Sequence, residues 1–143
     1  MTTKIHEIMT KSPITIGMND TVKHMGELFK SYGFHHLLVL DENQRLAGII
    51  SDRDYLKILS PFINTYSERD RDTAVLERKA HLIMSHQPKT AGPELTLSEA
   101  NHFFITQKVS CLPIVDKDQK VLGIVTWRDI LKWNESHRNC FEK

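Results

Sequence analysis

The sequence matches itself at an offset of 75 residues, and this internal repeat constrains the fold more than any other feature. The shift superimposes His6–Thr10 on His81–Ser85, and Gly48-Ile49 on Gly123-Ile124, without a gap. The matched residues differ in chemistry, so low complexity does not explain the register. The chain therefore holds two copies of one structural unit.

Each copy predicts the same order of elements: strand, helix, strand, strand, helix. In the first copy, an extended segment at 13–16 precedes a helical apolar pattern from Val22 to Tyr32, which ends at Gly33. Two apolar runs around a polar turn then predict a hairpin, and a final helix closes the unit. These later segments are 37–40, 46–50 and 52–59 in the first copy, and 112–115, 121–125 and 127–133 in the second. The predicted fold class is mixed α/β.

Capping residues mark where the helices begin. Asn19 and Asp20 are candidate caps ahead of the first helix. In the second copy, Thr96 and Glu99 have the spacing of a capping box.

The domain limits follow the repeat, because a unit of about fifty residues buries too little surface to be stable alone and two copies can pack together. We expect repeat one over 1–62, a charged and partly helical linker over 63–79, and repeat two with a short C-terminal tail over 80–143. Within the linker, the mixed charges of 67–72 predict a solvated, salt-bridged surface. The alternative is that Arg69 or Arg71 contacts a bound phosphate.

Composition excludes several classes of protein. The 143 residues carry a formal charge of +1, which gives no general attraction to nucleic acid or to an anionic membrane. No apolar run approaches the roughly 18 residues that span a bilayer, and the N-terminus lacks an apolar signal segment. The two cysteines, Cys111 and Cys140, are therefore expected to be reduced thiols in a cytoplasmic protein.

One motif closes the hairpin and starts the last helix of each copy. Gly48–Asp54 reads Gly-Ile-Ile-Ser-Asp-Arg-Asp, and Gly123–Asp129 reads Gly-Ile-Val-Thr-Trp-Arg-Asp. An Ile-Met-x-x-x-Pro-x-Thr segment precedes each copy, and Val109–Asp116 supplies a strand with a central proline. This ordered set, from about residue 5 to residue 133, resembles a pair of cystathionine-β-synthase (CBS) domains.

The resemblance implies a fold, a ligand class and an assembly. Paired CBS domains pack their sheets about a pseudo-twofold axis into a Bateman module. Two clefts result, which bind adenosine nucleotides in many members. Two modules commonly associate, so the resemblance also implies a homodimer.

In the family, the Ser/Thr-x-x-Asp of one repeat faces the first strand and hairpin of the other, which implies two sets of site residues. Cleft one would be lined by Ile49, Ser51, Arg53, Asp54, Pro88, Lys89, Val109 and Ser110. Cleft two would be lined by Ile124, Thr126, Arg128, Asp129, Pro13, Ile14, Phe34 and His35.

The chemistry of these residue types suits an adenine nucleotide. An ionised Asp accepts hydrogen bonds from both hydroxyls of a ribose. Branched side chains and Phe34 can sandwich the flat adenine. A hydroxyl at a helix start, with the first N–H groups and a neighbouring Arg, offers donors to phosphate.

Other interpretations stay open for the same residues. Ser-x-x-Asp is also the spacing of a helix capping box, and Gly48 and Gly123 can simply mark tight strand ends. His35 and His36 replace Ser110 and Cys111, so the two clefts are not equivalent. A metal site is not predicted, because His36 and Cys111 supply too few ligands for zinc.

The sequence thus predicts a regulatory module, not an enzyme, that binds AMP, ADP or ATP as a regulatory ligand and requires no cofactor. S-adenosylmethionine or another adenosyl ligand is an alternative. We expect the output to pass to a protein effector that the sequence does not name, without nucleic acid or membrane. The rival functions are an interaction scaffold with degenerate clefts and a nucleotide hydrolase.

Overall fold

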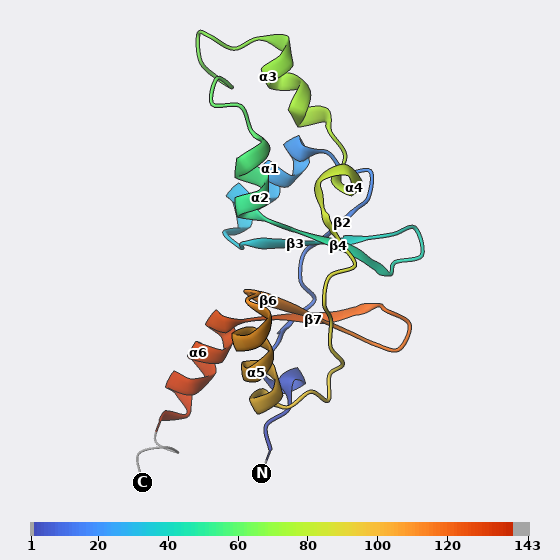
Figure 1. Cartoon of the computed structure of the whole chain (residues 1–143), viewed down its shortest axis with the longest axis vertical. Helices are drawn as coiled ribbons and strands as arrows, with labels where there is room; N and C mark the ends of the chain where they lie inside the picture. Colours follow the sequence, from blue (N-terminus) through green and yellow to red (C-terminus); the bar gives the residue numbers. More distant parts are fainter. Residues whose placement is uncertain (1, 139–143) are drawn as a thin grey trace. The chain divides into compact units, whose positions relative to one another are not determined.

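The structure, a computed structural model, describes residues 2–138. Its contacts divide the chain into two compact units. One unit is continuous, Ile14–Pro88, and the other joins Met1–Pro13 to Lys89–Lys143. We call them the central unit and the terminal unit. The sequence prediction of mixed α/β repeats is confirmed in both, and Figure 1 labels their elements.

The central unit is a four-stranded sheet covered by helices. Its strand order is β2-β3-β4-β5, with β2 parallel to β3 and the other pairs antiparallel. Helices α1 and α2 cover one face, and the apolar core lies between them and the sheet (Figure 1). The elements are β2 (Thr15–Gly17), α1 (Val22–Tyr32), β3 (His36–Leu40), β4 (Leu46–Ser51), α2 (Asp52–Ile58), α3 (Asp70–Ala74), η2 (Val75–Glu77), α4 (Ala80–Ile83) and β5 (Ser85–His86).

The terminal unit repeats this plan with a smaller sheet of order β1-β7-β6. Its first predicted strand is reduced to a single parallel bridge between Ala91 and Ile114. We attribute this to Pro113, which has no N–H to donate at the position where the central unit has Leu38. The elements are η1 (Ile5–Glu7), β1 (Thr10–Lys11), α5 (Leu97–Gln107), β6 (Cys111–Val115), β7 (Val121–Thr126) and α6 (Trp127–Ser136).

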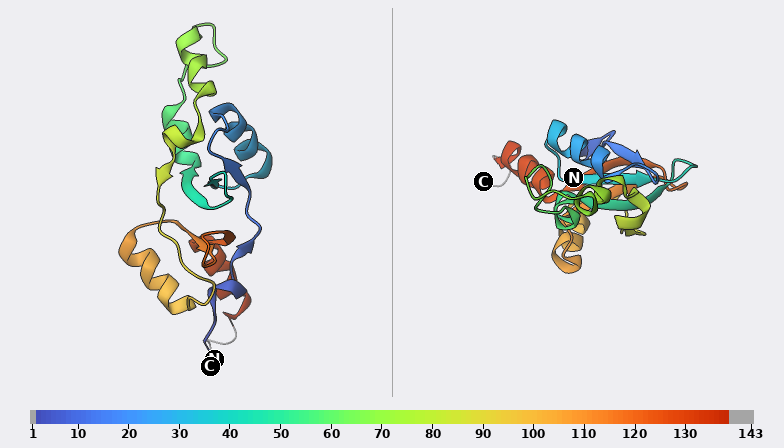
Figure 2. Two further views of the ribbon diagram at one scale, coloured as in Figure 1. Left: turned by 90° about the vertical axis from the view of Figure 1, so that its right-hand side faces the viewer. Right: turned by 90° about the horizontal axis from the view of Figure 1, so that it is seen from above.

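The short segment that precedes each repeat pairs with the other repeat. β1 pairs with β7 in the register Thr10↔Ile124, and β5 pairs with β4 in the equivalent register Ile49↔Ser85. The N-terminal segment, blue in Figures 1 and 2, therefore belongs to the terminal unit. The predicted limits at 62 and 80 follow the sequence repeat, whereas the contacts divide the chain after Pro13 and after Pro88.

Each segment that precedes one repeat pairs with the other repeat, and we call this the exchange. It explains two glycines that the sequence left ambiguous. A Cβ on Gly48 would lie 2.9 Å from the carbonyl oxygen of Ser85, and one on Gly123 would lie 2.8 Å from that of Thr10. The side chains of Met84 and Met9 lie against the same two positions. Each glycine is thus required by the close approach of the exchanged strand, because any side chain would collide with backbone.

The first long helix has a different cap from the predicted one. Thr21, not Asn19 or Asp20, is the N-cap of α1, and its side chain accepts a hydrogen bond from the His24 N–H at 3.2 Å. Asp20 instead accepts from the Gly17 N–H at 2.6 Å, which stabilises the preceding turn. The predicted stop at Gly33 is confirmed, with a φ of 67°.

The linker segment folds onto the central unit through one buried carboxylate. Asp72 is only 6% exposed, so the predicted solvated surface is wrong for this residue, although 67–71 are exposed. Its side chain accepts from the Ser60 hydroxyl at 2.6 Å and from the Arg69 N–H at 2.8 Å. These hydrogen bonds lower the pKa of Asp72, because they favour the charged form.

Candidate functional site

The predicted ligand-binding helix start of the central unit is a closed capping box. The Ser51 hydroxyl accepts from the Asp54 N–H at 3.0 Å, and the Asp54 carboxylate accepts from the Ser51 N–H at 3.2 Å. Ser51 ends strand β4, so the sheet fixes the point at which α2 begins. The capping interpretation is confirmed here. Each carboxylate oxygen has two acceptor positions, so the cap leaves Asp54 with further acceptor capacity.

The equivalent helix start in the terminal unit has more internal hydrogen bonds. The Thr126 N–H donates to the Asp129 carboxylate at 2.9 Å, and the Asp129 N–H donates to the Thr126 hydroxyl at 3.3 Å. The hydroxyl of Thr10, from the exchanged strand β1, donates to the other oxygen of Asp129 at 3.3 Å. Asp129 therefore has more of its acceptor capacity in use than Asp54 has.

The start of β3 lies directly beside the start of α2. His36 is paired with Ser51 in the sheet register, and the Asp52 N–H donates to the carbonyl oxygen of His35 at 2.8 Å. The His35 imidazole Nδ1 also contacts the Asp52 carboxylate at 2.7 Å. The sequence predicted a role for His35 in cleft two but none for Asp52, whose position in repeat two is occupied by Trp127.

His36, the neighbour of His35, is half-buried at the same sheet edge. Burial lowers the pKa of His36 below its ordinary 6.5, and the nearby carboxylate of Asp52 opposes that shift. At neutral pH His36 is therefore uncharged. Its counterpart Cys111 is buried as well, and burial raises the pKa of that thiol to about 12.

Phe34 belongs to an aromatic cluster inside the central unit. Its ring lies 5.8 Å from that of Phe29 and is stacked at 5.9 Å on that of Tyr32. Ile14 packs against the same core. The Phe34 ring is thus already packed against other aromatic side chains. Its predicted contact with adenine has to be compatible with this packing.

The remaining predicted residues are divided between the two units. Lys89 donates to the side-chain oxygen of Gln107 on α5. The central unit holds Ile49, Ser51, Arg53, Asp54, Pro88, Ile14, Phe34 and His35, and the terminal unit holds Lys89, Val109, Ser110, Pro13, Ile124, Thr126, Arg128 and Asp129. Their assignment to ligand-binding clefts stays a prediction.

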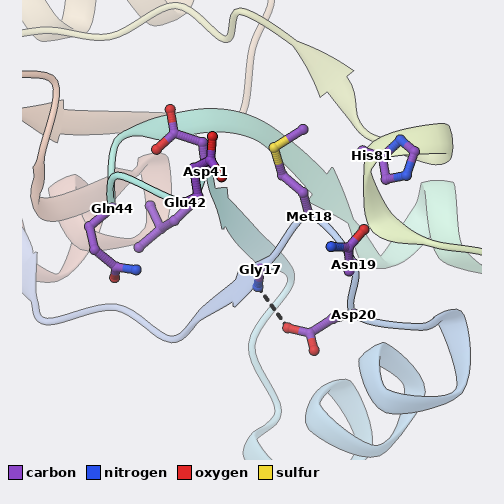
Figure 3. Close-up of a pocket in the computed structure, with 9 residues that line it drawn as sticks. Gly17, Met18, Asn19, Asp20, Asp41, Glu42, Gln44 and His81 are labelled. Atoms are coloured by element: carbon purple, nitrogen blue, oxygen red, sulfur yellow. Dashed lines mark hydrogen bonds between the residues drawn. The ribbon is translucent and has the colours of Figure 1, made fainter.

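A surface hollow of about 570 Å³ lies in the central unit, at the end of β3 that is far from the Ser51–Asp54 helix start (Figure 3). It is formed where β2 and β3 end, and sequence reasoning missed it. Its carboxylates stabilise turns: Asp20 accepts from Gly17, and Asp41 accepts from the N–H groups of Asn43 and Arg45 at 2.8 and 3.0 Å. The lining residues are Gly17, Met18, Asn19, Asp20, Leu40, Asp41, Glu42, Gln44 and His81.

Residues 2–138 contain neither a metal-binding cluster nor a membrane-spanning helix. This range holds no group of three or more His, Cys, Asp or Glu side chains arranged to bind a metal ion. Among the described helices, none is long and apolar enough to cross a membrane. Cys140 lies outside the described residues, so the predicted state of the cysteines concerns Cys111 alone.

The duplicated α/β unit, with a capped helix start in each copy, defines the chain as a tandem-domain protein. The chain belongs to the CBS domain family, because the family model for the CBS domain matches residues 5–61 and 80–136. Both matches coincide with the two copies detected by the internal repeat.

The relatives of the chain include proteins of different size. It is 32% identical over 128 residues to a CBS domain-containing protein of Dictyostelium discoideum, a match that covers 89% of this chain and 88% of the relative. It is 30% identical over 132 residues to inosine-5′-monophosphate dehydrogenase of Aquifex aeolicus, covering 92% of this chain but only 24% of the enzyme. The chain thus spans about a quarter of the dehydrogenase.

Solved structures share the fold. CBSX2 in complex with AMP has a TM-score of 0.80 at 21% identity, covering 95% of this chain and 98% of that one. The CBS domain pair of MJ0100, in complex with 5′-methylthioadenosine and S-adenosyl-L-methionine, has a TM-score of 0.77 at 24% identity, with the same coverage. At these identities the likeness shows the fold, which is that of a CBS domain pair.

Proposed function

We propose that this CBS pair binds an adenosyl ligand, of the AMP, ADP or ATP type, and passes its occupancy to a partner or to an oligomer. The observation that carries the proposal is the helix start that occurs twice, Ser51-x-x-Asp54 and Thr126-x-x-Asp129, each after a Gly-Ile strand end. AMP, S-adenosylmethionine and 5′-methylthioadenosine in two structures of the same fold support the ligand class.

In this proposal each carboxylate has two tasks. Asp54 and Asp129 cap their helices and also accept hydrogen bonds from the ribose hydroxyls. Ile49 and Ile124 contact the base, and Arg53 and Arg128, both exposed, contact phosphate. Lys89, Val109 and Ser110 complete cleft one, whereas Pro13, Ile14, Phe34 and His35 complete cleft two.

A thermal-shift panel of AMP, ADP, ATP, NAD and S-adenosylmethionine tests the proposal. A ligand at 100 times its Kd stabilises the folded state by about 2.7 kcal/mol. At least one compound is expected to raise the Tm of the wild type. Asp54→Ala and Asp129→Ala should each reduce that shift.

The matched control is Asp41→Ala. Asp41 also accepts two backbone hydrogen bonds, but it lies at the other end of β3, beside the hollow. This variant should lower the Tm of the free protein and keep the full ligand shift.

If no compound stabilises the wild type, the chain is instead a scaffold with degenerate clefts. Phosphate release from ATP and magnesium would indicate a hydrolase.

We also propose a homodimer. Leu56 on α2 and Leu131 on α6 occupy equivalent positions of the two repeats and are 64% and 54% exposed. Trp127, one turn before Leu131 on the same face of α6, is 55% exposed. Exposed apolar side chains at matched positions suit a symmetric interface. Light scattering should give twice the chain mass for the wild type and a lower mass for Leu56→Lys with Leu131→Lys.

A further inference from the structure

The two helix starts differ in charge at one position. In the central unit, residues 52–54 supply two carboxylates and one guanidinium, Asp52, Asp54 and Arg53. In the terminal unit, the equivalent residues supply one carboxylate and one guanidinium, because Trp127 stands at the position of Asp52. The formal charge of the turn is therefore one unit more negative in the central unit.

The structure places the additional carboxylate where a ligand at Ser51 would sense it. Asp52 is the first residue of α2 and its side chain is 40% exposed. Asp52 directly follows Ser51, and consecutive Cα atoms are about 3.8 Å apart, so an anion at Ser51 lies within a Debye length of the Asp52 carboxylate.

The surroundings hold Asp52 in place through His35. The His35 imidazole contacts its carboxylate at 2.7 Å, and the His35 carbonyl accepts its N–H at 2.8 Å. His36 faces the same group, and burial lowers its pKa, so it is uncharged at neutral pH. The terminal unit has Ser110 and Cys111 at these positions. The residues at the start of the hairpin and at the start of the last helix thus both differ between the two units.

We infer that Asp52, positioned by His35, is a specificity-determining residue of the Ser51 half-site (Ser51, Arg53 and Asp54): its carboxylate offsets the contact of Arg53 with phosphate, so that affinity falls with each phosphate added to an adenosyl ligand. The Thr126 half-site (Thr126, Arg128 and Asp129) has the uncharged Trp127 at this position and lacks this discrimination. The inference rests on the proposed function and adds ligand selectivity to it. Its physical cause is repulsion between the Asp52 carboxylate and ligand phosphates, which a neutral ligand such as 5′-methylthioadenosine does not experience.

Calorimetric titration with 5′-methylthioadenosine and with ATP tests the inference. The measured quantity is the ratio of the Kd for ATP to the Kd for 5′-methylthioadenosine at pH 7.5 and low salt. Asp129→Ala isolates the Ser51 half-site. Adding Asp52→Asn, which keeps a hydrogen-bonding group for His35, should lower the ratio about fivefold.

The reciprocal variant tests the other half-site. In an Asp54→Ala background, Trp127→Asp should raise the ratio about fivefold. Glu42→Gln is the control: it removes one negative charge from the β3–β4 turn of the central unit and should leave the ratio unchanged. The same ratio for Asp52→Asn in the otherwise unchanged chain gives a second measurement if an alanine background does not fold.

The outcomes separate the inference from the proposed function. If the ligands bind and Asp52→Asn leaves the ratio within twofold, the inference is wrong and the proposed function stands. A change of equal size in Glu42→Gln would also overturn it, because the effect would then reflect net charge. If neither compound binds the wild type, both fail together.

Discussion

The central and terminal units have nearly the same backbone hydrogen bonds but different side chains around them. In the central unit the Ala80 N–H donates to the Asp20 carbonyl at 2.8 Å; in the terminal unit the Ile5 N–H donates to the Leu95 carbonyl at 2.7 Å. The Val22 N–H donates to the Arg78 carbonyl and the Leu97 N–H donates to the Thr3 carbonyl, both at 2.9 Å. The duplication therefore preserves the scaffold, including the exchange of the preceding segments.

The side chains differ most at the start of the hairpin and of the last helix. The central unit has the contact between His35 and Asp52 and the stacked ring of Phe34. The terminal unit has a β6 strand that is buried throughout and an exposed Trp127. A shared scaffold with different side chains at one place is the observation on which our inference of separate ligand requirements for the two half-sites depends.

The largest effect is expected at the exchanged strands. Gly48→Ala and Gly123→Ala should each lower the free energy of unfolding by about 3 kcal/mol, because the added methyl group meets backbone at 2.9 and 2.8 Å. Similar losses would show that the exchange matters equally in both units. Denaturant unfolding monitored by circular dichroism measures this.

Gly92→Ala is the matched control for the glycine variants. A Cβ on Gly92 would have no neighbour within 4 Å, so the substitution should change the free energy of unfolding by less than about 0.5 kcal/mol. A small loss in Gly48→Ala or Gly123→Ala would contradict the close approach of β5 or β1.

The repeat made most of the fold predictable, and its symmetry also hid one feature. The 75-residue offset defined both hairpins and both closing helices, because the same apolar patterns occur twice. It did not reveal the exchange, because 6–10 and 81–85 are so alike that either could pair with either repeat. Only long-range contacts separate these alternatives.

The candidate site was predictable to a smaller extent. Ser-x-x-Asp specified the two capped helix starts, since capping depends on local spacing alone. Asp52 was missed, because its contact with His35 joins residues that are 17 positions apart in the sequence. Thr10 was missed for the same reason, because it reaches Asp129 across 119 positions.

The second effect concerns the helix caps. Ser51→Ala and Thr126→Ala should each lower the free energy of unfolding by about 1 kcal/mol, the usual cost of removing a side-chain cap. Thr126→Ser keeps the hydroxyl and should recover most of the loss. If both alanine variants have wild-type stability, the boxes do not stabilise the helices.

A smaller effect is expected from Thr10, whose hydroxyl donates to Asp129 at 3.3 Å. Thr10→Val keeps the shape and removes this hydrogen bond, so it should cost about 0.5 kcal/mol. Ser85→Ala is the equivalent change in the central unit. If Ser85→Ala costs more than Thr10→Val, the additional hydrogen bonding of Asp129 does not distinguish the two units.

The smallest effect is a pH dependence that only the central unit should show. Burial lowers the pKa of His36 from 6.5. The carboxylate of Asp52 opposes this shift, His35 adds to it, and the carboxylate of Asp54 opposes it. The unfolded chain therefore binds more protons than the folded one just below pH 6.5. Stability from this residue is fully present above pH 6.5 and is lost as the pH falls toward the lower pKa of the folded state.

Denaturant unfolding at pH 7.5, 6.5 and 5.5 measures this contribution of His36. His36→Gln should flatten the decline in the free energy of unfolding below pH 6.5, whereas the same change at the exposed His86 should keep the wild-type decline. Cys111, at the equivalent position, has a pKa of about 12 and does not titrate in this range. If His36→Gln and the wild type lose stability in parallel, the decline comes from other groups, and the two units do not differ in this respect.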